Sequence, residues 1–204
     1  MSTENKINSV ESSSAFTNVM NTIPIEYRKL IKKGILVIPI NEFFMKYPNL
    51  KDSMYNNILS NIKTSDNTMH KYTSTVPLSD SDINGINNVL WNFVREYYQL
   101  WNKKIPAYHG GFSIVYNKDH EKKLDQHIDD SLYTINMCIK NNNVEGSDVV
   151  FHGSTSNCYN LSYSDKKIFV PCKEDYMIIH LGNHPHQTNE LNDGERVNIV
   201  LWFK

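Results

Sequence analysis

A histidine, an aspartate and a group of later histidines in the C-terminal half of the chain could together bind a metal ion. His127 and Asp129 are two residues apart, so on an extended strand both side chains would point to the same face. Three further histidines follow near the end of the chain: His180, His184 and His186. Two imidazoles and one carboxylate form a facial set that suits Fe(II) and leaves coordination positions open. The sequence therefore predicts an iron site made of His127, Asp129 and one of the late histidines.

An arginine near the C-terminus could bind a small carboxylate beside that metal. Arg196 opens a mostly apolar run, residues 197–203, that is typical of a strand. Its guanidinium offers a planar, bidentate fork to a carboxylate whose other end the metal could hold. Because a buried guanidinium without a partner is costly, we expect it to point inward only where a carboxylate meets it. Strand alternation places further pocket candidates on two faces, with Arg196, Asn198, Val200 and Trp202 on one and Thr134, Asn136 and Cys138 on the other.

Three segments resemble the catalytic domain of the 2-oxoglutarate and Fe(II)-dependent oxygenases, in particular the prolyl and lysyl hydroxylase branch. Residues 112–116, FSIVY, resemble the strand that enters the family's core. Residues 126–136, QHIDDSLYTIN, are similar to the lysyl hydroxylase segment that carries a histidine and an aspartate and ends in TIN. Residues 180–186, HLGNHPH, followed by GER at 194–196, resemble the distal histidine and the arginine that binds 2-oxoglutarate. Residues 112–203, somewhat under half of the chain, carry the resemblance.

The resemblance implies a metal site and selects among the late histidines. In the family the arginine stands ten residues after the distal histidine ligand, and only His186 has this spacing to Arg196. Fe(II) is therefore expected on His127, Asp129 and His186. His180 and His184 would then lie beside the ligands or at the rim of the site.

The resemblance also implies which residues bind the co-substrate 2-oxoglutarate. Arg196 would pair with its far carboxylate, Tyr116 resembles the tyrosine that hydrogen-bonds the co-substrate in relatives, and Asn136 resembles the asparagine of the lysyl hydroxylases. With O2, and with ascorbate as an optional addition, such an enzyme hydroxylates its substrate and releases succinate and CO2. By family analogy the expected substrate is a peptidyl proline or lysine, so a peptide or protein is the expected partner.

Three rival functions are compatible with the same fold, one of which is a non-enzymatic binding module. An oxygenase of this kind could act on a modified nucleobase or a small metabolite instead of a peptide. Residues 144–148 and 173–175 depart from the glycine-rich turns of relatives, and the insert at 154–167 could carry substrate contacts. A cupin-like metal-binding protein without oxygenase activity could use the same triad, but it would not need Arg196.

Composition limits the partners and the compartment. The formal net charge is -1 and the sequence pI is about 6.7, so the chain lacks the electrostatic signature of a protein that binds duplex nucleic acid. The first residues lack the apolar core of a signal peptide, and no run approaches the ~18 apolar residues of a membrane-spanning helix. These features predict a cytoplasmic protein without a membrane segment.

The residues that could bind the metal need a β core to position them, and the sequence predicts an α+β fold. Beyond Pro106, eight strand-like segments follow one another without intervening helices, which fits a double-stranded β-helix, or jelly roll. The resemblance implies the same fold. The expected strands are 111–116, 124–129, 133–139, 149–152, 168–170, 176–180, 184–189 and 196–203.

Supporting helices are predicted before this core. Apolar residues at three- and four-residue spacing predict a helix over 80–102, with Ser79 as its N-cap. Shorter helices are expected over 25–33, 41–47 and 50–62, an edge strand over 35–40, and a loop or lid over 64–80. The expected organisation is a flexible arm (1–22), a helical support region (23–105) and a jelly-roll core (106–204) within one structural domain.

Overall fold

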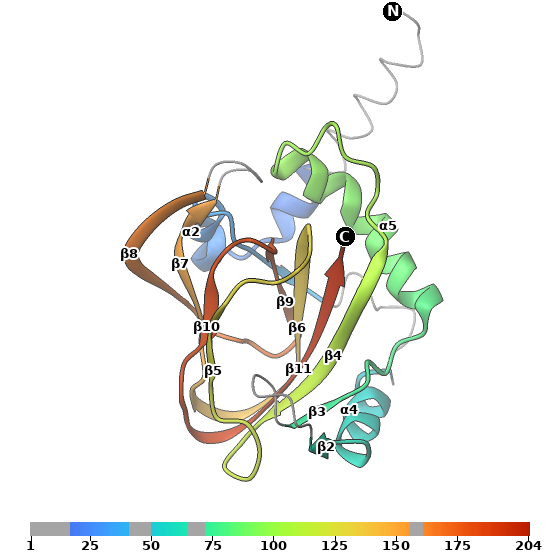
Figure 1. Cartoon of the computed structure of the whole chain (residues 1–204), viewed down its shortest axis with the longest axis vertical. Helices are drawn as coiled ribbons and strands as arrows, with labels where there is room; N and C mark the ends of the chain where they lie inside the picture. Colours follow the sequence, from blue (N-terminus) through green and yellow to red (C-terminus); the bar gives the residue numbers. More distant parts are fainter. Residues whose placement is uncertain (1–16, 41–49, 65–71, 156–160) are drawn as a thin grey trace, which may run out of the picture.

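Two antiparallel sheets face each other and form the core of the protein, as the computed structural model shows for residues 17–40, 50–64, 72–155 and 161–204 (Figure 1). The larger sheet has the strand order β1-β9-β6-β11-β4-β3-β2, and the smaller has the order β5-β10-β7-β8. The bounds in the first sheet are β1 Leu36–Pro39, β2 Lys63–Thr64, β3 Tyr72–Ser74, β4 Tyr108–Tyr116, β6 Tyr133–Gly146, β9 Tyr176–Leu181 and β11 Leu191–Phe203. Those in the second are β5 Leu124–His127, β7 Val149–Thr155, β8 Leu161–Val170 and β10 His186–Thr188. The eight strands β4 to β11 follow the predicted pattern beyond Pro106.

Strand β11 shows how alternation separates a packing face from a functional face. Val197, Ile199 and Leu201 are fully buried on the outer face of the larger sheet, in the main hydrophobic cluster. The intervening Arg196 and Asn198 are equally buried but point into the space between the sheets. Both faces of β11 are buried, so its sequence is almost continuously apolar. Polar residues interrupt it only on the inner face.

Helix α5, Asp80–Tyr97, covers the outer face of the larger sheet (Figure 1). The predicted N-cap is confirmed, because the Ser79 hydroxyl accepts a hydrogen bond from the Asp82 backbone N–H at 3.1 Å. The helix ends five residues before the predicted boundary, because Gln99 adopts a left-handed conformation with φ of 56°. The Leu100 N–H then bonds back to the Arg95 carbonyl, as in a Schellman motif. Trp101, which lies within the predicted helix over 80–102 and belongs to its apolar pattern, is therefore 56% exposed.

The remaining N-terminal elements agree only partly with the sequence prediction. The helix expected over 25–33 is a 3-10 turn, η1 (Ile25–Tyr27), followed by the short α2 (Arg28–Ile31), whereas α4 (Leu50–Ser60) is present as expected. Strand β1 lies at a sheet edge, as predicted. The expected loop over 64–80 is wrong in part, because β3 pairs with β4 there. The helix predicted over 41–47 lies outside the described residues.

Two predictions about the ends of the fold also need correction. Residues 17–22, part of the expected flexible arm, are helical, and residues 1–16 lie outside the described part of the chain. The strand predicted over 168–170 is longer than expected, because β8 begins at Leu161 and pairs with β7. We propose that the support region and the jelly roll form one structural domain, since a single hydrophobic cluster joins α5, β1 and the larger sheet. Within the described residues, no helix has both the length and the apolar character that crossing a membrane requires.

Candidate metal centre

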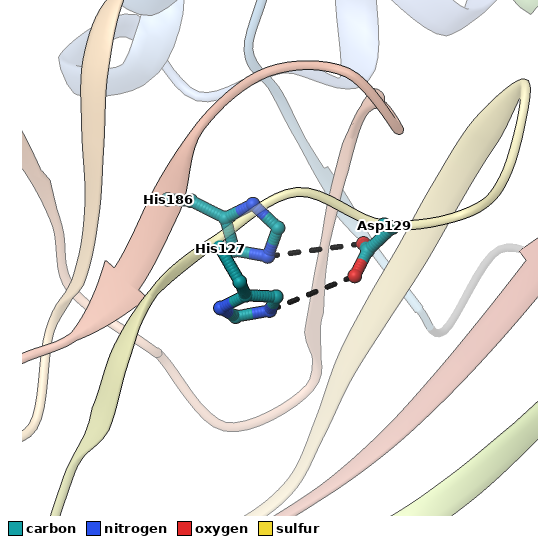
Figure 2. Close-up of side chains that lie close together, drawn as sticks. All are labelled: His127, Asp129 and His186. Carbon is teal, nitrogen blue, oxygen red and sulfur yellow. Dashed lines mark ion pairs between the residues drawn. The ribbon is translucent and has the colours of Figure 1, made fainter. Parts of the chain in front are cut away.

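Two neighbouring strands of the smaller sheet bring His127 and His186 together. His127 is the last residue of β5, His186 is the first of β10, and the two residues are paired in register. Asp129 follows in the loop after β5, so the predicted strand over 124–129 was too long. The donor atoms of these three residues all lie within 4.8 Å of one another. Figure 2 shows both imidazoles directed at the carboxylate of Asp129.

The loop that carries Asp129 is held by close contacts to the end of β9. The Asp129 N–H donates to the Gly182 carbonyl at 2.9 Å. A Cβ on Gly182 would lie 2.1 Å from the Ser131 carbonyl oxygen, so only glycine allows this approach. Thr134 Oγ1 donates to Asp129 Oδ2 at 2.6 Å and fixes the carboxylate. The carboxylate is thus placed before any metal binds.

The hydrogen bonds of the two imidazoles show which ring nitrogen of each is unprotonated and faces the carboxylate. His127 Nδ1 lies 2.9 Å from the Asp125 carbonyl oxygen, and His186 Nδ1 lies 2.9 Å from the His184 carbonyl oxygen. A carbonyl only accepts, so each Nδ1 carries the proton and each Nε2 presents a lone pair. These Nε2 atoms lie 3.6 Å and 3.8 Å from the Asp129 carboxylate oxygens. Three acceptors that converge without a proton between them fit a divalent cation.

Arg196 lies deeper between the sheets, on β11 opposite Tyr116 of β4. Its guanidinium carbon is 4.3 Å from the centroid of the Tyr116 ring, and Nη1 donates to the Ser147 carbonyl. Only 1% of the residue is exposed. Within the described residues, Nε has no hydrogen-bond partner and no carboxylate forms an ion pair with the guanidinium. The arginine is therefore buried between the sheets, and among the described residues the Asp148 carboxylate interacts with its charge without forming an ion pair.

A cavity between the sheets connects the triad to Tyr116. His127, Asp129 and His186 line it together with polar residues of both sheets: Tyr116, Thr134, Asn136, Thr188 and Asn198. The Tyr116 hydroxyl lies 3.3 Å from Thr188 Oγ1, and Asn198 Nδ2 donates to Asn136 Oδ1. Asn198 Oδ1 is buried and has no partner among the described residues. Arg196 is not on the cavity wall itself and lies behind Tyr116.

The remaining residues that the sequence suggested for the pocket fall into those that line the cavity and those that do not. His180 lines the cavity, whereas His184 is buried against Phe151 with a ring-centroid separation of 4.9 Å and does not reach it. Cys138 and Trp202 are not among the lining residues. Thr188 was missed, although alternation from His186 along β10 would have placed it on the same face.

The strand that carries Arg196 is attached to α4 through the preceding residue. The Tyr55 hydroxyl donates to Glu195 Oε1 at 2.7 Å, and Asn117 Nδ2 donates to Glu195 Oε2 at 2.9 Å. The hydrogen bond to Glu195 raises the pKa of Tyr55 to about 12. This carboxylate therefore links α4, the end of β4 and β11 beside the buried arginine.

Replacing Tyr55 by phenylalanine should destabilise the fold by about 1–2 kcal/mol, because a hydrogen bond to a charged group is lost. The melting temperature should fall by roughly 3–6 °C for a chain of this size, which differential scanning calorimetry would detect. Tyr108→Phe is the matched control, since that ring packs on Phe203 and no described residue hydrogen-bonds its hydroxyl. Equal melting temperatures for Tyr55→Phe and the control would contradict the role of this bond.

The metal-free protein should lose stability in weakly acidic solution. Burial lowers the pKa of His184 from 6.5 to about 4, and burial also lowers the pKa values of His180 and His186. The unfolded chain binds these protons near pH 6.5, but the folded chain binds them only at lower pH. The stabilisation is therefore complete above about pH 6.5 and is lost as the pH falls toward 4; for His184 alone it is roughly 3 kcal/mol.

Urea unfolding with a chelator present, at neutral pH and at about pH 5, would measure this dependence. His184→Leu should flatten it, whereas His109→Leu, at an exposed position of β4, should not. A wild-type midpoint that does not change between the two pH values would contradict the prediction.

Comparisons with known proteins agree with this geometry. No family model matches the sequence. The chain is 28% identical over 145 residues to the 2-oxoglutarate and iron-dependent oxygenase domain-containing protein CP2 of Arabidopsis thaliana, covering 68% of this chain and 36% of that protein. It is 29% identical over 101 residues to the similarly named ICU11 of the same plant, covering 47% and 24%. The chain thus spans only about a third or less of the length of these curated relatives.

Solved structures share the fold at low sequence identity. A 2OG-Fe(II) oxygenase family oxidoreductase from Burkholderia pseudomallei superposes with a TM-score of 0.60 at 12% identity, covering 95% of this chain and 90% of the other. A Pseudomonas putida prolyl-4-hydroxylase gives 0.58 at 10% identity, covering 93% and 98%. A Trichoplax adhaerens prolyl hydroxylase, solved with a hypoxia inducible factor peptide fragment, gives 0.55 at 13%, covering 95% and 91%.

These neighbours confirm the predicted double-stranded β-helix. The curated relatives carry the same family name that the motifs around His127 and Arg196 predict. In sequence and in fold, the chain is thus similar to members of the 2-oxoglutarate and iron-dependent oxygenase family.

Proposed function

We propose that the chain is an Fe(II)- and 2-oxoglutarate-dependent dioxygenase that hydroxylates its substrate and releases succinate and CO2. The observation that carries the proposal is a cavity with a candidate cation site on its wall and a buried arginine just behind its Tyr116 wall, and no described carboxylate pairs with this arginine. A dicarboxylic co-substrate that is held by the metal at one end and by the arginine at the other satisfies both groups. A cupin-like metal-binding protein would have no use for the arginine.

In this proposal each residue of the cavity has a defined task. His127, Asp129 and His186 hold the iron, which supplies the oxidising chemistry when it is bound with 2-oxoglutarate and O2. Arg196 neutralises the far carboxylate, and the Tyr116 hydroxyl stands at the same end of the cavity to donate to it.

The side-chain amides of Asn136 and Asn198 are hydrogen-bonded to each other, and both residues line the cavity. Because Asn136 Oδ1 accepts from Asn198, its own amide N–H groups remain as donors on the cavity side of β6. The Oδ1 atom of Asn198 has no partner within the described chain, so a ligand or a water would satisfy it. Asn198 is buried and Asn136 is half-buried, which limits the access of bulk water to the cavity.

We further propose a peptidyl proline or lysine as the substrate, and hence a peptide or protein partner. Support comes from the likeness of the fold to two prolyl hydroxylases, one of which was solved with a bound peptide fragment. The near-neutral net charge of the chain agrees with a substrate other than duplex nucleic acid.

The test is a coupled measurement of succinate and of substrate oxidation. The protein is incubated with Fe(II), 2-oxoglutarate and ascorbate, with and without a library of proline- and lysine-containing peptides, and the peptides are analysed by mass spectrometry. The expected result is peptide-stimulated succinate release with a mass gain of one oxygen atom on proline or lysine. Succinate release that only a modified nucleobase or a small metabolite stimulates would contradict the peptide substrate, and no release with metal bound would contradict the oxygenase.

A further inference from the structure

A third imidazole lies in the cavity beside the triad. His180 is on β9, is 1% exposed, and lines the same cavity as the three predicted ligands. Its Nε2 atom lies 3.8 Å from Asp129 Oδ2, which is the same separation as that of His186 Nε2 from this oxygen. His180 is nevertheless outside the set of donor atoms that lie within 4.8 Å of one another. It is therefore next to the metal position without completing the ligand set.

The ring of His180 is held in one orientation. Its Nδ1 atom lies 2.9 Å from the Leu181 carbonyl oxygen, so Nδ1 carries the proton and Nε2 is an acceptor. The ring packs against Phe151 and His186, with centroid separations of 5.1 Å and 4.5 Å. The backbone of β9 is paired on both sides, with β1 and with β6, so the position of the side chain is fixed from both directions.

In this orientation, the acceptor atom Nε2 of His180 faces another acceptor, Oδ2 of Asp129. His180 Nε2 and Asp129 Oδ2 are too far apart for a direct hydrogen bond, and the tautomer leaves no proton between them. Thr134 Oγ1 already donates to the same carboxylate oxygen, so Asp129 does not depend on His180 to be held. A buried acceptor that faces a polar cavity is costly unless a donor reaches it. A donor that enters the cavity, such as a water, would satisfy His180 Nε2.

We propose that His180 is a positioning residue of the metal centre, whose Nε2 accepts a hydrogen bond from a water bound on the open side of the cation. A cation held by His127, Asp129 and His186 would lie at the wall of the cavity that His180 also lines. This inference rests on the proposed metal site, because the water that donates to His180 is held by the cation. The role of His180 is to orient that water and to slow its exchange, which adds to the affinity for the metal.

Two substitutions at His180 separate this role from simple packing. His180→Phe keeps a flat ring against Phe151 but removes the acceptor, whereas His180→Gln keeps an acceptor oxygen. His109→Ala, which removes an exposed imidazole from β4, is the matched control for loss of a histidine. The full chain is loaded with Mn²⁺ without co-substrate; metal affinity is measured by calorimetry, and the exchange of metal-bound water is measured by ¹⁷O NMR relaxation.

In His180→Phe, we expect about a 10-fold loss of Mn²⁺ affinity and faster exchange of the bound water. His180→Gln should partly restore both the affinity and the slower exchange, and the His109→Ala control should not change either. Wild-type affinity and exchange in a folded His180→Phe would overturn the proposal. Should His180→Phe fail to fold, ¹⁵N-histidine NMR of the Zn²⁺-loaded wild type decides: an Nε2 shift of a hydrogen-bonded acceptor supports the role. An Nε2 that is protonated or directly coordinated overturns it.

Asp129→Ala, measured beside these variants, shows whether the metal site or the role of His180 has failed. If Asp129→Ala loses Mn²⁺ while His180→Phe does not differ from wild type, the metal site stands and only the role of His180 is rejected. If wild type and Asp129→Ala bind Mn²⁺ equally weakly, the cation site fails and the role of His180 fails with it. Peptide oxidation is not needed for any of these readouts.

Discussion

Asp129→Ala should abolish 2-oxoglutarate turnover and lower metal affinity by about 100-fold or more, at the upper end of what single changes around a metal produce. Asp129 supplies the anionic donor, and the two Nε2 lone pairs that remain would face each other without a carboxylate to balance the cation. The folded metal-free protein should not lose stability, because a buried carboxylate held by one threonine hydroxyl is removed with its desolvation cost.

Thermal unfolding with and without Mn²⁺ measures both parts of this prediction. At a metal concentration of about 100 times Kd, binding should stabilise wild type by about 2.7 kcal/mol, or roughly 5–10 °C, and Asp129→Ala should show no such shift. Asp125→Ala is the control, since that carboxylate is two residues before His127, is 89% exposed and pairs with Lys123. A metal-induced shift that persists in Asp129→Ala would remove the carboxylate from the ligand set.

Local patterns predicted much of the inner face of the core strands, although Cys138 and Trp202, which were assigned to the same faces, do not line the cavity. Alternation placed Arg196 and Asn198 together on β11 and Thr134 and Asn136 together on β6, and these pairs do point between the sheets. The position of His186 beside His127 was beyond such patterns, because it depends on the pairing of β10 with β5 across 59 residues. The family spacing to Arg196 supplied that long-range information instead.

The errors arise where tertiary pairing overrides local composition. Strand β8 is rich in serine, lysine and aspartate because it is the edge strand of the smaller sheet, and charged edges resist pairing with other chains. Strand β3 is short and polar, and its pairing with β4 is what makes it a strand. Asp129 left the predicted strand because its N–H bonds to Gly182 rather than to a neighbouring strand. The cavity position of His180 likewise follows from the pairing of β9 with β6.

Replacing Arg196 by methionine should weaken 2-oxoglutarate binding by about 100-fold or more, since a desolvated carboxylate would lose its paired cation, a loss of about 2–5 kcal/mol. Arg196→Lys should give a smaller loss, because it keeps the charge but not the bidentate fork. The co-substrate affinity of the Mn²⁺-loaded protein can be measured by calorimetry, with Arg95→Met on α5 as the control, where the guanidinium lies over the exposed Trp101.

The same methionine variant also distinguishes a functional arginine from a structural one. If Arg196 stabilised the fold, its replacement would lower the melting temperature. Arg196 instead contacts the Ser147 carbonyl and the Tyr116 ring, has a bare Nε and forms no ion pair with a carboxylate among the described residues, so little in the chain offsets the cost of its burial. Exchange of such a charge for a methionine of similar length should leave the stability of the co-substrate-free protein unchanged or raise it by about 1–4 kcal/mol. A large loss of stability together with intact 2-oxoglutarate binding would reverse this assignment, because the guanidinium would then serve the fold rather than the ligand.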